Sequence, residues 1–230
     1  MRLETLFLDA GGVLVNPSWE RVADALRRRG VAIEAAALAA VEPHAKRTFD
    51  SPRYVGTSTE ETRGWLYFNL VLTRAGIPLS DATDAALAEL REYHGRSNLW
   101  ESVPDEVGPA LGRFREAGLR LVVVSNANGT LRAHLDRLGL APLVDAVFDS
   151  HDEGVEKPDP RFFAIALERG GARPETTMHV GDLYRVDVMG ARAAGLRAVL
   201  LDAADLYPEA DCLRVRSLLA LADRIETGSL

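Results

Sequence analysis

Five short apolar runs alternate with segments of helical periodicity, and this alternation constrains the fold of the 230-residue chain more than any other feature. The runs read as buried strands at Thr5–Leu8, Leu119–Val124, Ala146–Phe148, Met178–Val180 and Ala198–Leu201. Helical segments lie between most of them, at Glu106–Glu116, Leu131–Leu138, Arg161–Glu168 and Val186–Ala194. Strands that alternate with helices are joined by right-handed crossovers in a parallel sheet. The sequence therefore predicts an α/β fold.

Glycines follow several of the predicted helices, at Gly118, Gly139, Gly170 and Gly195. A helix commonly ends in a residue with a positive φ, which glycine adopts without steric strain. These glycines are therefore predicted to end their helices and to turn the chain towards the next strand.

The region after the first strand, up to about Gly95, breaks the alternation because it has helical patterns and no strand. Its predicted helices span Trp19–Arg29, Glu34–Phe49, Glu60–Arg74 and Asp81–His94. Ser80 is placed to cap the last helix, and Pro43 marks a point where the second is expected to break. We therefore expect an all-helical domain, residues 17–97, inserted into an α/β core formed by residues 1–16 and 98–230.

The 27 basic and 34 acidic side chains give a formal net charge of −7. Binding to nucleic acid or to an anionic membrane surface requires a surplus of Lys and Arg, so neither partner is expected. No apolar run approaches the roughly 18 residues of a membrane span, and the first residues do not resemble a secretion signal. Cys212, the single cysteine, excludes an internal disulfide. These features are typical of a cytoplasmic enzyme, monomeric or homodimeric, with a small-molecule substrate.

Two predicted strands end in polar residues suited to chemistry. Asp9 follows the first strand and precedes Gly11 and Gly12, which let the backbone approach a ligand closely. Ser125 and Asn126 follow the second strand, where a hydroxyl and a backbone amide could donate to phosphate oxygens. The carboxyl ends of parallel strands are where such sheets bind ligands. Each pattern is also compatible with an ordinary turn or helix cap.

Two further elements carry ionisable groups. Lys157 precedes Pro158 and is one of only two lysines beside 25 arginines. Because an ammonium and a guanidinium are not interchangeable, this retained lysine favours a specific role over a solvated surface charge. Asp182 ends the fourth strand, and Asp187 follows about one turn later. Carboxylate oxygens are ligands that Mg²⁺ prefers, although acids at a helix start also stabilise the helix dipole.

In their order along the chain, these four elements resemble the motifs of the haloacid dehalogenase superfamily. The resemblance covers essentially the whole chain, including a helical cap inserted after the first strand of a Rossmann-like α/β core. It implies that Asp9 is a nucleophile, which forms an aspartyl-phosphate that water then hydrolyses. It also implies that Mg²⁺ is held by Asp9, the backbone carbonyl of Gly11 and Asp182.

The same resemblance implies roles for the other residues. Asp187 would orient either a water molecule at the metal or the ammonium of Lys157. Ser125 and the backbone of Asn126 would hold the phosphoryl oxygens of a small phosphorylated substrate. Lys157 would offset the charge of those oxygens, so that catalysis depends mainly on positioning and electrostatics.

The sequence departs from the superfamily pattern at one position. Phosphatases of this superfamily usually carry a second aspartate two residues after the nucleophile, which protonates the leaving group and then activates water. Here that position is Gly11, which has no side chain. General acid–base catalysis typically contributes about 10²–10⁴-fold to the rate, so its loss need not abolish the reaction. Phosphate-ester hydrolysis that is slow, limited to good leaving groups, or supplied with a proton from elsewhere is the favoured prediction.

Three other functions stay open. Phosphonoacetaldehyde hydrolases of the superfamily also lack the second acid and use a cap lysine that forms a Schiff base; Lys46 is the lysine of the helical region, though surface lysines are usually solvated charges. Dehalogenation of 2-haloacids through Asp9 needs no metal, and Asp182 argues against it. A non-catalytic scaffold would explain Gly11, but it would have no chemical need for the remaining motif residues.

Substrate choice is expected to depend on the helical region, which would close over the strand ends and exclude water. Its basic residues could meet an anionic substrate or could simply be solvated; they are His44, Lys46, Arg47, Arg53 and Arg63. Trp65, Tyr67 and Phe68 are compatible both with packing inside the helical domain and with substrate contact. A sugar phosphate, a phosphoglycolate-like acid and a nucleotide all fit the sequence.

Overall fold

The computed structural model describes residues 2–55 and 60–230, with the side chains of residues 2–54 and 65–230. The chain divides into two compact units. Unit 1 consists of Met1–Asn16 and Val103–Leu230, and unit 2 consists of Pro17–Ser102. Residues 98–102 therefore lie in unit 2. Each unit has buried apolar residues of its own, so the two are described in turn.

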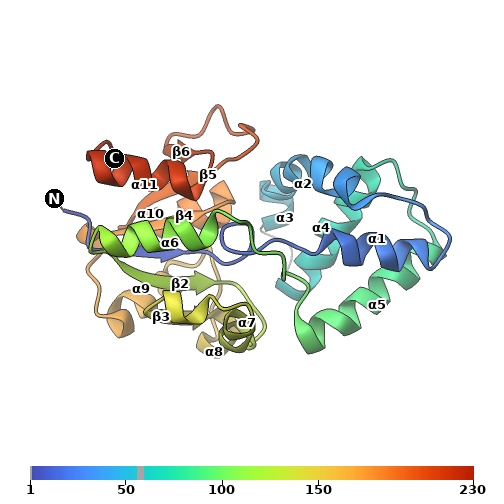
Figure 1. Ribbon diagram of the computed structural model, residues 1–230, viewed down its shortest axis with the longest axis horizontal. Coiled ribbons are helices and arrows are strands. Elements are labelled where there is room, and N and C mark those ends of the chain that lie inside the picture. Colours follow the sequence, from blue (N-terminus) through green and yellow to red (C-terminus); the bar gives the residue numbers. More distant parts are fainter. Residues whose placement is uncertain (1, 56–59) are drawn as a thin grey trace. The chain divides into compact units, whose positions relative to one another are not determined.

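Unit 1 contains a six-stranded sheet in which all neighbouring strands are parallel. The strands are β1 (Thr5–Leu8), β2 (Arg120–Ser125), β3 (Ala146–Asp149), β4 (Thr177–Gly181), β5 (Arg197–Leu201) and β6 (Leu213–Val215). Their order across the sheet is β3-β2-β1-β4-β5-β6 (Figure 1). The central strand β1 lies between β2 and β4, with Leu8 level with Val123 and Val180. The predicted parallel α/β fold is confirmed.

The sixth strand, β6, was not expected from the sequence. It is only three residues long, with Arg214 at its centre, and it pairs with β5. So short a run with a charge in the middle lacks the apolar signal of a buried strand. Its extended conformation depends on pairing with β5, a contact that local sequence does not reveal.

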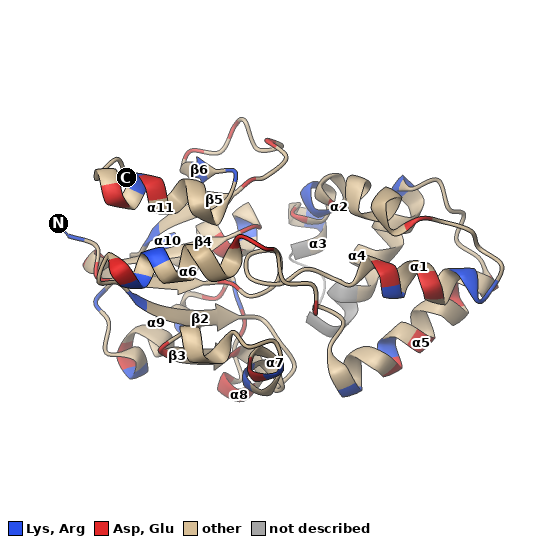
Figure 2. Cartoon of the chain, viewed as in Figure 1, with Lys and Arg blue, Asp and Glu red and all other residues tan. Residues whose placement is uncertain are grey.

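Helices connect the strands of unit 1. They are α6 (Val107–Glu116), α7 (Leu131–Arg137), α8 (Ser150–Glu153), α9 (Pro160–Gly170), α10 (Met189–Ala193) and α11 (Leu218–Thr227), with a π-helical turn at Tyr184–Val188 leading into α10. Short 3₁₀ turns occupy Ala141–Leu143 and Pro174–Thr176. Helices α6 and α11 pack together, and both carry charged residues (Figure 2). Arg113 of α6 lies 2.7 Å from Asp223 and 2.6 Å from Glu226 of α11.

Glycines end several of these helices. Gly118, Gly139 and Gly195 have φ values of 79°, 72° and 81°, as expected. The prediction for Gly170 is wrong, because this residue is the last of α9 and the next one, Gly171, takes the positive φ of 59°. Gly170 is buried and faces the ring of Phe148, so it stays in the packed helix while Gly171 makes the turn.

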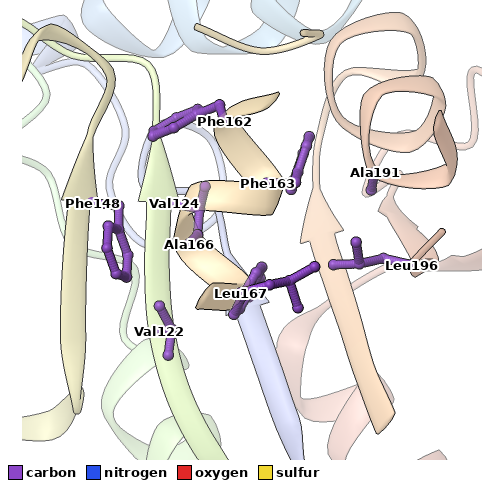
Figure 3. Packing of buried hydrophobic residues seen from close by; sticks show 10 residues of the cluster. Val122, Val124, Phe148, Phe162, Phe163, Ala166, Leu167, Ala191 and Leu196 are labelled. Atoms are coloured by element: carbon purple, nitrogen blue, oxygen red, sulfur yellow. The ribbon is translucent and has the colours of Figure 1, made fainter. Parts of the chain in front are cut away.

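One face of the sheet packs against α9 and α10. Figure 3 shows Phe162, Phe163 and Leu167 of α9 against the strand residues, which include Val122, Val124 and Phe148. Phe7 of the central strand belongs to the same cluster. Burying one such side chain contributes roughly 1.5–3 kcal/mol. Because this packing holds the strands firmly, the residues at the strand ends have well-defined positions.

Unit 2 is entirely helical in the part that the structure describes. Its helices are α1 (Trp19–Arg27), α2 (Ala35–Phe49), α3 (Pro52–Val55), α4 (Glu60–Arg74) and α5 (Asp81–Ser97). Helix α1 packs against α2 and α5, and α2 packs against α4. Aromatic rings fill the space between them: Phe68 lies 5.9 Å from Trp19, 5.5 Å from Trp65 and 5.2 Å from Tyr67, measured between ring centroids. Tyr67 and Phe68 of α4 are therefore buried inside unit 2, and Trp65 of the same helix is half-buried.

Two details of unit 2 concern helix continuity. The expected break at Pro43 is wrong, because α2 runs without interruption through this residue. A proline inside a helix costs about 3 kcal/mol, and the packing of α2 against α1 and α4 offsets that cost. The predicted cap of α5 is present: Ser80 Oγ accepts from the backbone N–H of Thr83, and Thr83 Oγ1 accepts from the N–H of Ser80.

Candidate active site

Three neighbouring strands bring polar residues to one edge of the sheet. Asp9 directly follows β1, Ser125 is the last residue of β2, and Asp182 directly follows β4. Since β1 lies between β2 and β4 and all three run in the same direction, their carboxyl ends meet. All three side chains are nearly buried.

The carboxylate of Asp9 is held by three contacts, all to Oδ1. It accepts hydrogen bonds from the backbone N–H of Ala10 at 2.8 Å and from Ser125 Oγ at 2.6 Å, and it lies 2.9 Å from Lys157 Nζ. The other oxygen, Oδ2, takes part in none of these contacts. Asp9 is therefore rigidly oriented through one oxygen while the second remains available for chemistry.

The ammonium of Lys157 is buried between two carboxylates. Its Nζ lies 2.9 Å from Asp9 Oδ1 and 2.7 Å from Asp187 Oδ1, and the side chain is 1% exposed. Burial opposes the charge, but the two neighbouring carboxylates outweigh it and raise the pKa of Lys157 above its ordinary value. Both carboxylates therefore favour the charged form of Lys157.

The backbone of Lys157 is fixed by the side chain of Asn126. The N–H of Lys157 donates to Asn126 Oδ1 at 2.8 Å, and Asn126 Nδ2 donates to the carbonyl of Lys157 at 3.0 Å. This side-chain contact joins the end of β2 to the loop before α9, and the sequence did not reveal it. The role predicted for Asn126, a backbone amide that meets phosphoryl oxygens, concerns a different part of the same residue.

Asp187 lies on the π-helical turn and is completely enclosed. Besides Lys157, it accepts a hydrogen bond from His179 Nε2 at 2.9 Å through Oδ1 and from the backbone N–H of Leu183 at 3.0 Å through Oδ2. Burial alone would raise the pKa of Asp187, but Lys157 and His179 lower it below its ordinary value. A Cβ atom at Gly181 would collide with the side chain of Asp187, so this glycine leaves the space that the carboxylate occupies.

His179 is the residue of this cluster to which the sequence analysis assigned no role. It lies within β4, is 0% exposed and has its ring edge-on to Phe163, with 4.9 Å between centroids. Burial lowers the pKa of His179, against the opposing effect of Asp187, so the imidazole is neutral at pH 7. The signal in the sequence was a histidine inside an otherwise apolar strand.

Carboxylate oxygens gather at this edge in an arrangement that suits a metal ion. One oxygen each of Asp9, Asp182 and Asp187 lies within 4.8 Å of the others. Hard oxygen donors of this kind are what Mg²⁺ prefers.

Beside these carboxylates the chain turns sharply after β1. The carbonyl of Ala10 accepts from the N–H groups of Leu14 and Val15, and Gly12 has a φ of 76°. Gly11 lies in this turn and contributes backbone atoms only.

Comparison with known proteins assigns the chain to a family. Residues 3–195 match the haloacid dehalogenase-like hydrolase family. The chain belongs to this family. It is 32% identical to haloacid dehalogenase-like hydrolase domain-containing protein 3 of Mus musculus, over 94% of this chain and 91% of that protein.

Two other comparisons bear on activity and fold. The hydrolase is 35% identical to the ribulose-1,5-bisphosphate 5-phosphatase of Halopiger xanaduensis, over 64% of this chain and 61% of that protein. Its fold resembles the crystal structure of the HAD-hydrolase YfnB from Bacillus subtilis, with a TM-score of 0.70, 20% identity, and coverage of 98% of this chain and 99% of that chain. The family match identifies the chain as a hydrolase, and one of its relatives is a phosphatase.

Lys46, a basic residue singled out in the sequence, lies in unit 2. Lys46 Nζ lies 2.9 Å from Glu42 Oε1, and Glu42 Oε1 also accepts from the hydroxyl of Tyr67. The ammonium of Lys46 is thus paired with a carboxylate of its own helix. The side chain of Arg63 lies outside the described residues.

Among the helices that the structure describes, none has the length and apolar character needed to cross a bilayer.

Proposed function

We propose that this hydrolase is a magnesium-dependent phosphatase that acts on a small phosphorylated metabolite through an aspartyl-phosphate at Asp9. The observation that carries the proposal is the buried ion pair of Lys157 with Asp9. Burying a lysine between two carboxylates has a desolvation cost that its ion pairs offset, and this arrangement fixes an ammonium beside the nucleophile. An ammonium held there would stabilise the negative charge of a phosphoryl group that is transferred to Asp9.

The residues present fit a magnesium ion. Asp9 and Asp182 would hold it together with the backbone carbonyl of Gly11, and Asp187 would stay engaged with Lys157, His179 and Leu183. One carboxylate oxygen of Asp9 and one of Asp182 lie within 4.8 Å of each other, and hard oxygen donors are what this ion selects. When bound, Mg²⁺ would offset the negative charge of the phosphoryl oxygens.

The chain's own residues supply the nucleophile and the charge stabilisation for both steps, while solvent gives a proton to the leaving oxygen and takes one from the attacking water. A carboxylate oxygen of Asp9 attacks phosphorus, the bond from phosphorus to the ester oxygen breaks, and an aspartyl-phosphate forms. Water then attacks phosphorus, the bond to Asp9 breaks, and inorganic phosphate leaves. Ser125 donates its hydroxyl and Lys157 its ammonium to the phosphoryl oxygens in both steps. Their positions beside Asp9 mean that little reorganisation is required.

Protonation of the leaving group is the step that this site assists least. Gly11 supplies no acid, and the carboxylates of Asp9 and Asp187 favour retention of the proton on Lys157. Substrates whose leaving oxygen needs no proton are therefore expected to react faster than simple alkyl phosphates. The relative that hydrolyses a sugar bisphosphate supports the general class of small phosphate esters. Unit 2 is proposed to act as the cap that selects among them.

The proposal is tested by phosphate release from a panel of aryl, acyl and sugar phosphates, with Mg²⁺ and with EDTA. Wild-type protein is expected to release phosphate only with the metal. Asp9→Asn keeps the shape of the side chain but removes the nucleophile, so turnover should fall by on the order of 10⁴-fold. Asp223→Asn, at an exposed aspartate of α11, is the matched control and should retain full activity.

Binding of beryllofluoride provides a readout that does not depend on turnover. This phosphoryl analogue is expected to raise the melting temperature of wild-type protein in the presence of Mg²⁺, and to leave that of Asp9→Asn unchanged. Activity that survives in Asp9→Asn would contradict the mechanism. A protein that releases no phosphate from any ester and binds no beryllofluoride would contradict the function.

A further inference from the structure

His179 is a polar residue in the centre of an apolar layer. On β4 it lies level with Phe7 of β1 on one side and Ala198 of β5 on the other, and Phe163 of α9 packs against its ring. Both Phe7 and Phe163 belong to the buried cluster drawn in Figure 3. An aliphatic side chain would suit this position better if packing were its only function.

The two ring nitrogens of His179 differ in their surroundings. Its Nδ1 is buried and has no hydrogen-bond partner among the described residues. Leaving a buried polar atom unsatisfied costs about 1–3 kcal/mol. A residue that carries this cost within a core strand is expected to be retained for its other nitrogen. That nitrogen, Nε2, lies 2.9 Å from Asp187 Oδ1 and faces a carboxylate, so Nε2 carries the hydrogen and donates.

The hydrogen bond from His179 acts on the oxygen that also binds Lys157. Asp187 Oδ1 receives His179 Nε2 and Lys157 Nζ, while Oδ2 receives the backbone N–H of Leu183. Three donors from three segments leave the carboxylate no freedom to rotate. Without His179, two donors remain, and Asp187 could turn Oδ1 away from Lys157.

We propose that His179 is a positioning residue: its Nε2–H holds Asp187 so that the ammonium of Lys157 stays against Asp9. This inference rests on the proposed function for its catalytic consequence, but the placement of Lys157 is a separate property of the protein. The chain of contacts runs from His179 through Asp187 and Lys157 to Asp9, and each link is at most 2.9 Å long.

Two substitutions at His179 separate positioning from packing. In His179→Gln the side-chain amide can place a donor where Nε2 was, whereas His179→Leu removes the donor and also the unsatisfied Nδ1. We expect His179→Leu to lower kcat about 10- to 100-fold with little change in KM. His179→Gln should restore most of kcat. The melting temperature of His179→Leu should change little, because loss of the hydrogen bond to Asp187 is offset by loss of the unsatisfied Nδ1.

The matched control is His134→Leu, at another buried histidine, on α7 and outside the site. It should leave kcat and KM unchanged. The proposal is overturned if His179→Leu keeps the wild-type kcat. It is also overturned if kcat falls only together with the melting temperature, or if His179→Gln is as impaired as His179→Leu.

A labelling experiment tests the placement of Lys157 without any turnover. The chain has only two lysines, so reductive methylation followed by peptide mass spectrometry compares Lys157 with Lys46 as an internal reference. In the wild type, Lys157 should react far more slowly than Lys46, because its ammonium is buried and paired. His179→Leu should raise the ratio of Lys157 to Lys46 labelling several-fold, and His179→Gln and His134→Leu should not.

The two readouts distinguish failure of this inference from failure of the proposed function. A wild-type protein without phosphatase activity, but with the expected labelling ratios, would refute the function and support the placement of Lys157 by His179. Equal labelling ratios in wild type and His179→Leu would overturn the inference, whatever the activity of the enzyme.

Discussion

At the scale of single residues, the site depends on one positive charge shared between two negative ones. Lys157 is the sole cation in contact with Asp9 among the described residues, and it also neutralises Asp187. Removing one partner of such a buried group leaves an uncompensated charge, which is strongly destabilising. The cation must also fit between two carboxylates that lie within 2.9 Å of it, so its size and shape should matter as much as its charge.

Lys157→Arg tests the identity of the cation. The larger planar guanidinium cannot occupy the space of an ammonium that lies within 2.9 Å of both carboxylates, so kcat/KM should fall by on the order of 10²-fold or more. Phosphate release under saturating Mg²⁺ is the measurement. Lys46→Arg, at the other lysine of the chain, is the control and should hydrolyse phosphate esters normally. Full activity in Lys157→Arg would show that charge alone is sufficient.

Gly11→Asp tests the missing acid. An acid two residues after the nucleophile should speed hydrolysis of esters with poor leaving groups by about 10²-fold or more, and should change aryl phosphates much less. The positive φ of this turn belongs to Gly12 and not to Gly11, so a side chain at position 11 meets no backbone strain of that kind. Gly12→Asp, which would be strained, is expected to lower the melting temperature. An unchanged preference among leaving groups in a folded Gly11→Asp protein would contradict this account.

At the scale of secondary structure, Gly181 at the end of β4 leaves the space that Asp187 occupies. In Gly181→Ala the new methyl group would collide with the carboxylate of Asp187, so either β4 or the π-helical turn must move. We expect a loss of stability of about 1–3 kcal/mol in urea unfolding, together with lower kcat. Gly112→Ala in α6 is the matched control, since a Cβ there meets nothing within 4 Å. It should stabilise the protein slightly, by up to about 1 kcal/mol.

At the scale of the whole molecule, burial of His179 links stability to pH. Its pKa is lowered in the folded protein, so below about pH 6.5 the unfolded chain binds a proton that the folded chain does not. The contribution of this residue to stability is therefore complete above about pH 6.5 and is lost progressively as the pH falls below that value. Urea unfolding in EDTA between about pH 5 and 7.5 measures this slope. His179→Gln should flatten it, and identical slopes in the two proteins would contradict the assignment.

Most of the α/β framework was predictable because its strands and helices carry their own periodicity. The apolar runs at β1 and β4 and the cap at Ser80 are local signals, and the structure places each element within a few residues of its predicted bounds. The sixth strand and the path of α2 through Pro43 were not predictable. Both depend on neighbouring elements: β6 on pairing with β5, and α2 on packing against α4.

The sequence by itself determined which residues reach the site, since Asp9, Ser125 and Asp182 follow from strand ends in a parallel sheet. Only the tertiary structure decided how they interact. Ser125 donates to Asp9, which lies 116 positions away in the sequence, and the side chain of Asn126 accepts from the backbone N–H of Lys157, 31 positions away. Hydrogen bonds of 2.6 and 2.8 Å require atomic positions defined to within a fraction of an ångström. That precision comes from strand register and core packing, which no local pattern encodes.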